Sequence, residues 1–271
     1  MEKKLLLFDV DGTLISYDGI VPKSCVQALK KAKEQGHEIF VVTGRTRNRA
    51  TVGGIEVNGM ICGNGAYIEA NGVVLQDKKL SLEDIIKITD YLDERDFDYF
   101  LEGNDGIYGS KHFEKRAVDT YRRYGHQEPV VIRKLYPTMQ FPESMHIENI
   151  TKVNYILHTY QDYLDFKEMF SEFKCLTWGG QGEEALFGDC ALDGIDKAKA
   201  IHQLIDYMNI SKENIYAFGD AEVDVPMFQC AGTSICVGSG REEAKKAATY
   251  VTEDVKDDGI AKALKHFGII D

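Results

Sequence analysis

The chain of 271 residues carries a formal net charge of −12, and 44% of its residues are hydrophobic and 28% charged. This composition is ordinary for a globular protein with one large domain or two modest ones. The acidic balance argues against a nucleic-acid groove and against an anionic membrane surface as a partner. It would also repel phosphate ligands, so any phosphate site needs cations close by.

Neither a leader segment nor a membrane span is expected. The apolar run at residues 5–8 is too short for the core of a signal peptide, and no uninterrupted apolar stretch reaches the length that crosses a bilayer. The six cysteines are scattered without a Cys-X-X-Cys pair, and we interpret them as reduced residues of the core. These features predict a cytoplasmic protein.

Strand and helix signals alternate in the first third of the chain. Apolar runs at residues 4–8, 38–42 and 60–62 predict strands, and each is followed by a polar or glycine-rich turn. A helical pattern opens with a proline and covers residues 22–35, and Gly36 stands where a helix C-cap belongs.

The last third returns to this alternation, with a helix predicted at residues 197–208 and strands at 215–218 and 235–237. Strands that alternate with helices are typical of a mostly parallel sheet covered on both faces. We therefore predict an α/β fold whose core is a Rossmann-like, doubly wound parallel sheet.

The middle of the chain has a different pattern. Long amphipathic helices are predicted at residues 82–92 and 160–173, and more polar, aromatic-rich strands at 98–101 and 152–157. This pattern predicts an α+β domain inserted into the α/β core. The predicted bounds are 1–80 plus 190–271 for the core and 81–189 for the insertion.

The first chemical motif is Phe-Asp-Val-Asp-Gly-Thr at residues 8–13. Asp9 and Asp11, two positions apart after a strand, project to the same side. Adjacent carboxylates repel each other, so one pKa rises unless a cation lies between them. Gly12 lets the chain leave the strand tightly, and Thr13 can hydrogen-bond back into the turn. An acidic turn without function is the alternative, but the motif is too specific for that to be favoured.

Two further polar segments follow predicted strands, at the sheet edge where open α/β sheets bind ligands. Thr43-Gly44-Arg45 offers a hydroxyl, an unhindered N–H group and a guanidinium, although a threonine there is usually a helix cap. Asp220 and Asp224 lie four residues apart and share one face if a helix begins there. Taken alone, such a pair is more often surface acid than metal ligand.

Lys197 begins a predicted helix, where a positive charge faces the positive end of the helix dipole. The lysine is either solvated or balanced by an anion bound at the helix start. The residue alone does not favour either hypothesis.

Together, these four segments resemble the haloacid dehalogenase superfamily, and specifically its Cof-type sugar phosphatases with a large class IIB cap. The resemblance covers the whole chain, and its most specific part is residues 8–13. Other matching segments are Gly63-Asn64-Gly65-Ala66 and the tail from Ala217 through Pro226-Met227 to Val251-Thr252 and Asp258-Gly259.

The resemblance implies an Mg²⁺-dependent phosphatase with Asp9 as nucleophile, which forms an aspartyl-phosphate that water then hydrolyses. Asp11 matches the general acid and base. Thr43, Gly44 and Lys197 match the residues that bind the phosphoryl group.

The resemblance also implies an Mg²⁺ site formed by the carboxylates of Asp9 and Asp220 and the backbone carbonyl of Asp11, with Asp224 orienting waters or Lys197. The insertion at residues 81–189 corresponds to a cap that closes over the site and contacts the leaving group. Arg45 and Asn64 are further candidates for contacts to the substrate.

Two positions depart from the pattern of the resembled branch. Val223 stands where asparagine is common before the last aspartate, and valine can neither donate to phosphate nor reach the metal shell. Ala198 replaces the glycine that commonly follows the lysine, which is a mild change.

The expected partner is a small phosphorylated metabolite, with no nucleic acid and no membrane. Two other functions stay open: a phosphomutase with the same site, and a sugar-phosphate-binding protein with little turnover. The intact pair of Asp9 and Asp11 argues against pure binding. The identity of the metabolite and the oligomeric state do not follow from the sequence.

Overall fold

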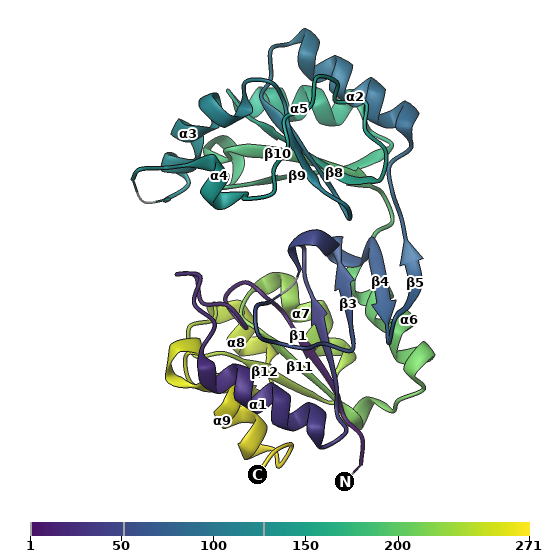
Figure 1. The fold of residues 1–271 in the computed structure, drawn as a ribbon, viewed down its shortest axis with the longest axis vertical. Coiled ribbons are helices and arrows are strands. Elements are labelled where there is room, and N and C mark those ends of the chain that lie inside the picture. The colour runs from purple at the N-terminus through teal and green to yellow at the C-terminus, as the bar shows by residue number, and fades with distance from the viewer. Residues whose placement is uncertain (1, 51, 127) are drawn as a thin grey trace. The chain divides into compact units, whose positions relative to one another are not determined.

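The computed structural model describes residues 2–50, 52–126 and 128–271. The chain forms two compact units, Met1–Asp77 with Ile195–Asp271, and Lys78–Gly194 (Figure 1). These boundaries lie within a few residues of the predicted ones. The assignment of the two parts to a catalytic core and a cap stays a prediction.

An eight-stranded sheet forms the centre of the first unit, in the order β13-β12-β11-β1-β2-β3-β4-β5. The strands from β13 to β3 run parallel, whereas β4 and β5 form an antiparallel hairpin at the edge. The strands are β1 (Leu5–Phe8), β2 (Glu38–Val42), β3 (Gly59–Cys62), β4 (Tyr67–Ala70), β5 (Val73–Asp77), β11 (Ile215–Gly219), β12 (Thr233–Cys236) and β13 (Tyr250–Val251).

Helices cover both faces of this sheet. In β1, Leu6 and Phe8 face one core, which α1 and α9 complete, while Leu5 and Leu7 face a second core, completed by α6, α7 and α8. The predicted doubly wound α/β core is therefore confirmed. The helices are α1 (Lys23–Glu34), α6 (Lys197–Met208), α7 (Val225–Cys230), α8 (Glu242–Ala247) and α9 (Gly259–His266).

The second unit contains a five-stranded antiparallel sheet in the order β7-β6-β8-β10-β9. Helices α2 and α5 pack on one face, and α3 and α4 pack on the other. The elements are α2 (Leu82–Glu94), β6 (Tyr99–Gly103), β7 (Ile107–Gly109), α3 (Phe113–Arg123), α4 (Ile132–Leu135), β8 (Ile150–Ile156), α5 (Tyr160–Met169), β9 (Phe173–Trp178) and β10 (Phe187–Leu192). This is the α+β architecture that the sequence predicts.

The helix predicted at residues 160–173 is shorter than expected. It ends at Met169, because Phe170 leaves the helical region with φ −115° and ψ 45°. Phe173 then starts β9, which pairs with β10 at the edge of the sheet. The apolar spacing continues past Met169, but the chain has to turn there to supply the edge strand.

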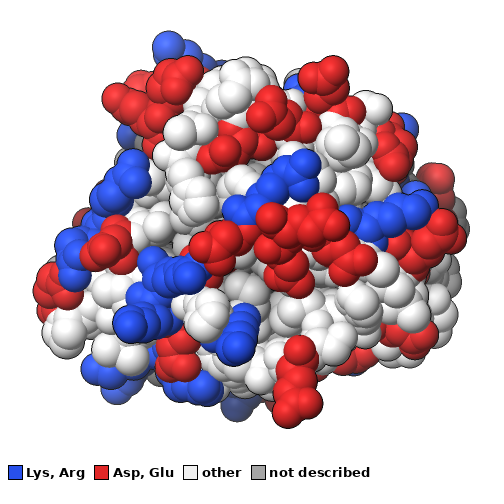
Figure 2. All heavy atoms as spheres, turned by 90° about the horizontal axis from the view of Figure 1, so that it is seen from above, with Lys and Arg blue, Asp and Glu red and all other residues white. Residues whose placement is uncertain are grey.

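All six cysteines are free and buried, as expected for reduced core residues. Among the described residues, no helix combines the length and the apolar character needed to cross a bilayer. Lysine and arginine side chains are interspersed among aspartates and glutamates on the face of the molecule that Figure 2 shows.

Candidate active site

The pairing of β1 with β11 brings the two acidic motifs together. These buried strands run parallel with Phe8 opposite Phe218, and the rings of this pair stack at 4.4 Å between centroids. The ladder continues one residue further, because the Asp9 N–H group donates to the Phe218 carbonyl at 2.9 Å. Parallel neighbours end at the same edge of a sheet, so Asp9 and Asp220 emerge side by side.

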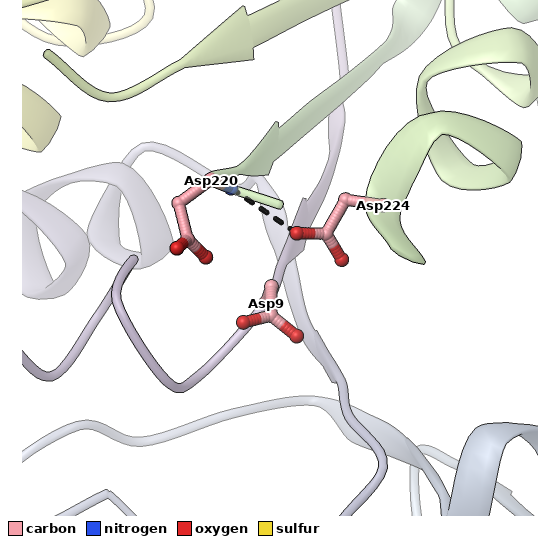
Figure 3. Close-up of side chains that lie close together, drawn as sticks. All are labelled: Asp9, Asp220 and Asp224. Carbon is pink, nitrogen blue, oxygen red and sulfur yellow. Dashed lines mark hydrogen bonds between the residues drawn. The ribbon is translucent and has the colours of Figure 1, made fainter. Parts of the chain in front are cut away.

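Three carboxylates converge at this edge. Asp9, Asp220 and Asp224 each have a carboxylate oxygen within 4.8 Å of the others (Figure 3). Their exposed fractions are only 8%, 1% and 0%. Hard oxygen donors grouped in this way suit a divalent cation such as Mg²⁺.

The backbone after β11 holds Asp224 in this cluster. Its Oδ2 accepts hydrogen bonds from the N–H groups of Asp220, at 3.1 Å, and Ala221, at 3.2 Å. The 3₁₀ turn Glu222–Asp224 folds the side chain back over Gly219. A Cβ at position 219 would lie 2.6 Å from the Cβ of Asp224, so this close return requires glycine.

Lys197 brings a positive charge to two of the three carboxylates. Its Nζ donates to Asp224 Oδ1 at 2.7 Å and lies 3.7 Å from Asp9 Oδ1. The side chain is only 7% exposed, which excludes the hypothesis that this lysine is solvated. Lys197 is the first residue of α6, and the preceding Asp196 caps the helix by accepting from the N–H group of Lys199 at 2.9 Å.

The carboxylates remain short of positive charge. Burial raises the pKa of Asp9 well above its ordinary value, and the charges of Asp224, Asp220 and Asp11 raise it further against the opposing effect of Lys197. Burial likewise raises the pKa of Asp220, and the charge of Asp224 adds to this effect, whereas a hydrogen bond from Tyr17 opposes it. A bound divalent cation would relieve this deficit, so the residues present fit such an ion.

Two hydroxyl groups bind Asp220. Thr13 Oγ1 donates to Oδ1 at 3.3 Å, and the Tyr17 hydroxyl donates to Oδ2 at 2.5 Å. Gly12, inside the first motif, has φ +87°, and a Cβ there would lie 2.4 Å from Asp220 Oδ2. The Thr13 hydroxyl thus binds Asp220, which follows β11, rather than its own turn as predicted. The contact of Tyr17 was not predicted from the sequence.

Asp11 lies outside the three-carboxylate cluster. Its side chain is 53% exposed and is bound by Arg45, whose Nε donates to Oδ2 at 2.8 Å while a second guanidinium nitrogen donates to Oδ1. Arg45 also donates to the Arg49 carbonyl at 3.2 Å. The partner of Arg45 in this structure is thus Asp11, a contact that the sequence did not suggest.

The loop after β2 and the turn after β3 are joined by backbone hydrogen bonds. The N–H group of Asn64 donates to the Thr43 carbonyl at 3.1 Å, and the Gly63 N–H group donates to the Arg45 carbonyl at 2.8 Å. Thr43 is buried, and its Oγ1 accepts from the Arg45 N–H group at 3.1 Å. The Asn64 side chain lies beside exposed Gly44, 3.3 Å from where a Cβ would stand.

This turn also contacts the start of α6. A Cβ at Gly65 would lie 2.9 Å from both the Asp196 carbonyl and the Ala200 Cβ. The close packing brings the helix start that carries Lys197 up to the same sheet edge.

Val223 stands where the resembled branch commonly has asparagine. Its side chain is 66% exposed and therefore does not pack into the core.

Open α/β sheets bind ligands at the carboxyl ends of their strands, which is where the acidic residues lie in this unit. Residues 6–264 match the sequence pattern of haloacid dehalogenase-like hydrolases, so the chain belongs to this family. The recognition drawn from residues 8–13 is thereby confirmed.

Individual relatives agree with the family. YkrA of Bacillus subtilis, named as a phosphatase, is 25% identical over 275 residues, which cover 100% of both chains. The solved structure of BT1666 from Bacteroides thetaiotaomicron is described among phosphatases of the haloalkanoate superfamily. It is 27% identical with a TM-score of 0.76, and the match covers 98% of this chain and 96% of that one. The sugar phosphatase BT4131, of subclass IIB, is 25% identical with a TM-score of 0.70, covering 98% and 100%. These names agree with the prediction of a phosphoric monoester hydrolase of the Cof type.

Lys197→Met should destabilise the metal-free protein. The change removes the ammonium and leaves buried carboxylates without their opposing charge, so the free energy of unfolding should fall by about 3 kcal/mol at neutral pH. Urea unfolding in the presence of EDTA measures this loss.

Lys199→Met is the matched control, because Lys199 lies on the same helix and is exposed. This variant should stay within about 0.5 kcal/mol of the native protein. Equal stability of the two variants would contradict the charge balance described for Lys197.

Proposed function

We propose that this protein is an Mg²⁺-dependent phosphatase that hydrolyses small phosphorylated metabolites, such as sugar phosphates, through an aspartyl-phosphate on Asp9. The observation that carries the proposal is the convergence of three buried carboxylates at the carboxyl ends of β1 and β11, two of them paired with Lys197. The names of the relatives support phosphate esters as substrates. A cytoplasmic location is part of the proposal and is supported by the six free cysteines.

The reaction proceeds in two displacements at phosphorus. In the first, the Asp9 carboxylate attacks, the bond from phosphorus to the leaving oxygen breaks, and Asp11 gives its proton to that oxygen. In the second, Asp11 takes a proton from water, which attacks the phosphoryl group and releases Asp9 and inorganic phosphate. The Asp11 side chain is 53% exposed, which supports this role because the group has to be accessible to substrate and water.

Thr43, Gly44 and Lys197 are proposed to bind the phosphoryl oxygens. The Thr43 hydroxyl accepts a hydrogen bond from the Arg45 N–H group, and a hydroxyl that accepts can still donate its own hydrogen. Gly44 is exposed and has no side chain to block approach to its N–H group. Lys197 contributes a charge that is already desolvated and fixed by Asp224, so little reorganisation accompanies binding.

Asp9 and Asp220 would hold Mg²⁺ through their carboxylates, with Asp224 beside them and the backbone carbonyl of Asp11 as a further ligand. When bound, the ion supplies the positive charge that allows these carboxylates and a phosphate group to share one pocket. Asp224 would at the same time orient Lys197, to which it is hydrogen-bonded.

The leaving group is proposed to contact Arg45 and Asn64, and residues 81–189 are proposed to form the cap domain that sets substrate specificity. Support for Arg45 is its guanidinium on the proposed acid, Asp11, which would place it beside the leaving oxygen. Asn64 is exposed, and its side chain adjoins Gly44. These contacts would select among metabolites after the common phosphoryl group is bound.

Asp9→Asn should abolish turnover, because an amide does not attack phosphorus. Release of inorganic phosphate from a panel of phosphorylated metabolites, with Mg²⁺ present, measures the effect. Asp257→Asn changes an exposed aspartate of the same unit and should keep full activity. Substantial phosphatase activity in folded Asp9→Asn protein would refute the covalent mechanism.

The raised pKa values of Asp9 and Asp220 set the sign of the pH dependence of the protein's stability. A carboxyl whose pKa is higher in the folded than in the unfolded protein adds its full contribution to stability at a pH below its unfolded pKa of about 4. This contribution is lost as the pH rises through the folded pKa. Mg²⁺ binds the ionised form and should restore the loss. We therefore expect Mg²⁺ to raise Tm more at about pH 7.5 than at about pH 5.

Scanning calorimetry with and without EDTA at each pH isolates this shift from the titration of other groups. Phosphate release should also stop in excess EDTA and return with added Mg²⁺. A Tm shift that is no larger at the higher pH, or full turnover in EDTA, would count against a metal on these carboxylates.

Val223→Asn should improve catalytic efficiency toward small phosphate esters. The new amide would add a hydrogen bond to a charged group, worth on the order of 1.5–3 kcal/mol, so the gain could reach roughly tenfold to a hundredfold. Since Val223 is 66% exposed, stability should change by no more than about 0.5 kcal/mol. Kinetics and thermal unfolding of the same variant check both points, and a stable variant without improved efficiency would mean that another group already makes this contact.

A further inference from the structure

Tyr17 is a surface residue whose hydroxyl points into the carboxylate cluster. The residue is 70% exposed, yet its hydroxyl donates to Asp220 Oδ2 at 2.5 Å. The two residues lie 203 positions apart in the chain. The roles proposed for Asp9, Asp11 and Lys197 leave this contact unexplained.

A closed turn at residues 16–20 positions this side chain. The N–H group of Ser16 donates to the Ile20 carbonyl at 2.9 Å, and the Gly19 N–H group donates to the Ser16 carbonyl at 2.7 Å. The Ile20 N–H group also donates to Ser16 Oγ at 3.2 Å. The backbone around Tyr17 is therefore fixed on both sides of the residue.

The tyrosine ring is also fixed by close packing on Gly12. A Cβ at position 12 would lie 2.8 Å from Tyr17 Cζ and 2.4 Å from Asp220 Oδ2. The ring thus occupies the space that glycine leaves open, directly beside the carboxylate. This packing does not depend on the hydroxyl, so the ring and the hydroxyl can be tested separately.

Tyr17 and Thr13 together give each oxygen of Asp220 one hydroxyl donor. Two donors on one carboxylate fix its rotation and favour its charged form, while each oxygen keeps lone pairs for a metal ion. Asp224 is fixed instead by backbone N–H groups and Lys197. For Asp220, the hydroxyl of Tyr17 makes the shorter of the two contacts.

We propose that Tyr17 is a positioning residue that raises the affinity of the site for Mg²⁺ by holding the Asp220 carboxylate in its ligating orientation. The inference rests on the proposed function, in which Asp220 is a metal ligand. Groups that orient a metal ligand typically change metal affinity by ten- to a hundredfold. Tyr17 acts through Asp220 and requires no contact with the substrate.

Tyr17→Phe tests this role, because it removes the hydroxyl and keeps the ring on Gly12. Isothermal titration of the metal-free protein with Mg²⁺ should show a Kd about tenfold higher than that of the native protein. Tyr207→Phe is the matched control, since Tyr207 is also an exposed tyrosine of the same unit, on α6. It should leave the Kd unchanged.

Turnover provides a second, independent measurement. At saturating Mg²⁺, Tyr17→Phe should recover the native kcat and the native KM for a phosphate ester, because only metal occupancy is affected. A native Kd in the variant would overturn the inference and leave the proposed function intact, as would a raised KM that excess Mg²⁺ does not rescue. Absence of saturable Mg²⁺ binding by the native protein would overturn the proposed metal site and this inference together.

Discussion

The mutual repulsion of Asp9, Asp220 and Asp224 is the constraint on which the rest of the site depends. Their burial follows from the fold, because β1 and β11 lie inside a sheet covered on both faces and the acidic residues directly continue these strands. Carboxylates in such a place are costly unless donors and cations compensate them. The surrounding structure supplies this compensation from several separate elements.

Most of the compensating groups are fixed before any ligand arrives. Asp224 is held by backbone N–H groups of its own turn and by Lys197 at the start of α6, and Asp220 is held by two hydroxyls. Backbone donors and packed side chains lose little further freedom when a ligand binds, which favours tight binding of a charged group. The remaining shortage of positive charge is what makes the cluster suited to a divalent cation.

A chain with a net charge of −12 needs positive charge close to its site to attract a phosphate ester. Lys197 is buried among the carboxylates and Arg45 is bound to Asp11, so both cations are placed locally rather than spread over the surface. Short-range charges outweigh the bulk field, because the Debye length at physiological salt is about 8 Å. Since both cations are already paired with carboxylates, recognition of a phosphate ester would depend on the proposed Mg²⁺ as well.

The sequence by itself determined the class of fold, the family and the residues that could carry the chemistry. Apolar runs and helix caps are local signals, so the helix at Lys197–Met208 and the strands that end just before Asp9 and Asp220 could be predicted. Only the tertiary structure decided that Arg45 binds Asp11, that Tyr17 binds Asp220, and that α5 ends at Met169. Periodicity reports how a segment buries its own side chains, whereas a contact such as that of Tyr17 with Asp220 depends on how segments far apart in the sequence pack together.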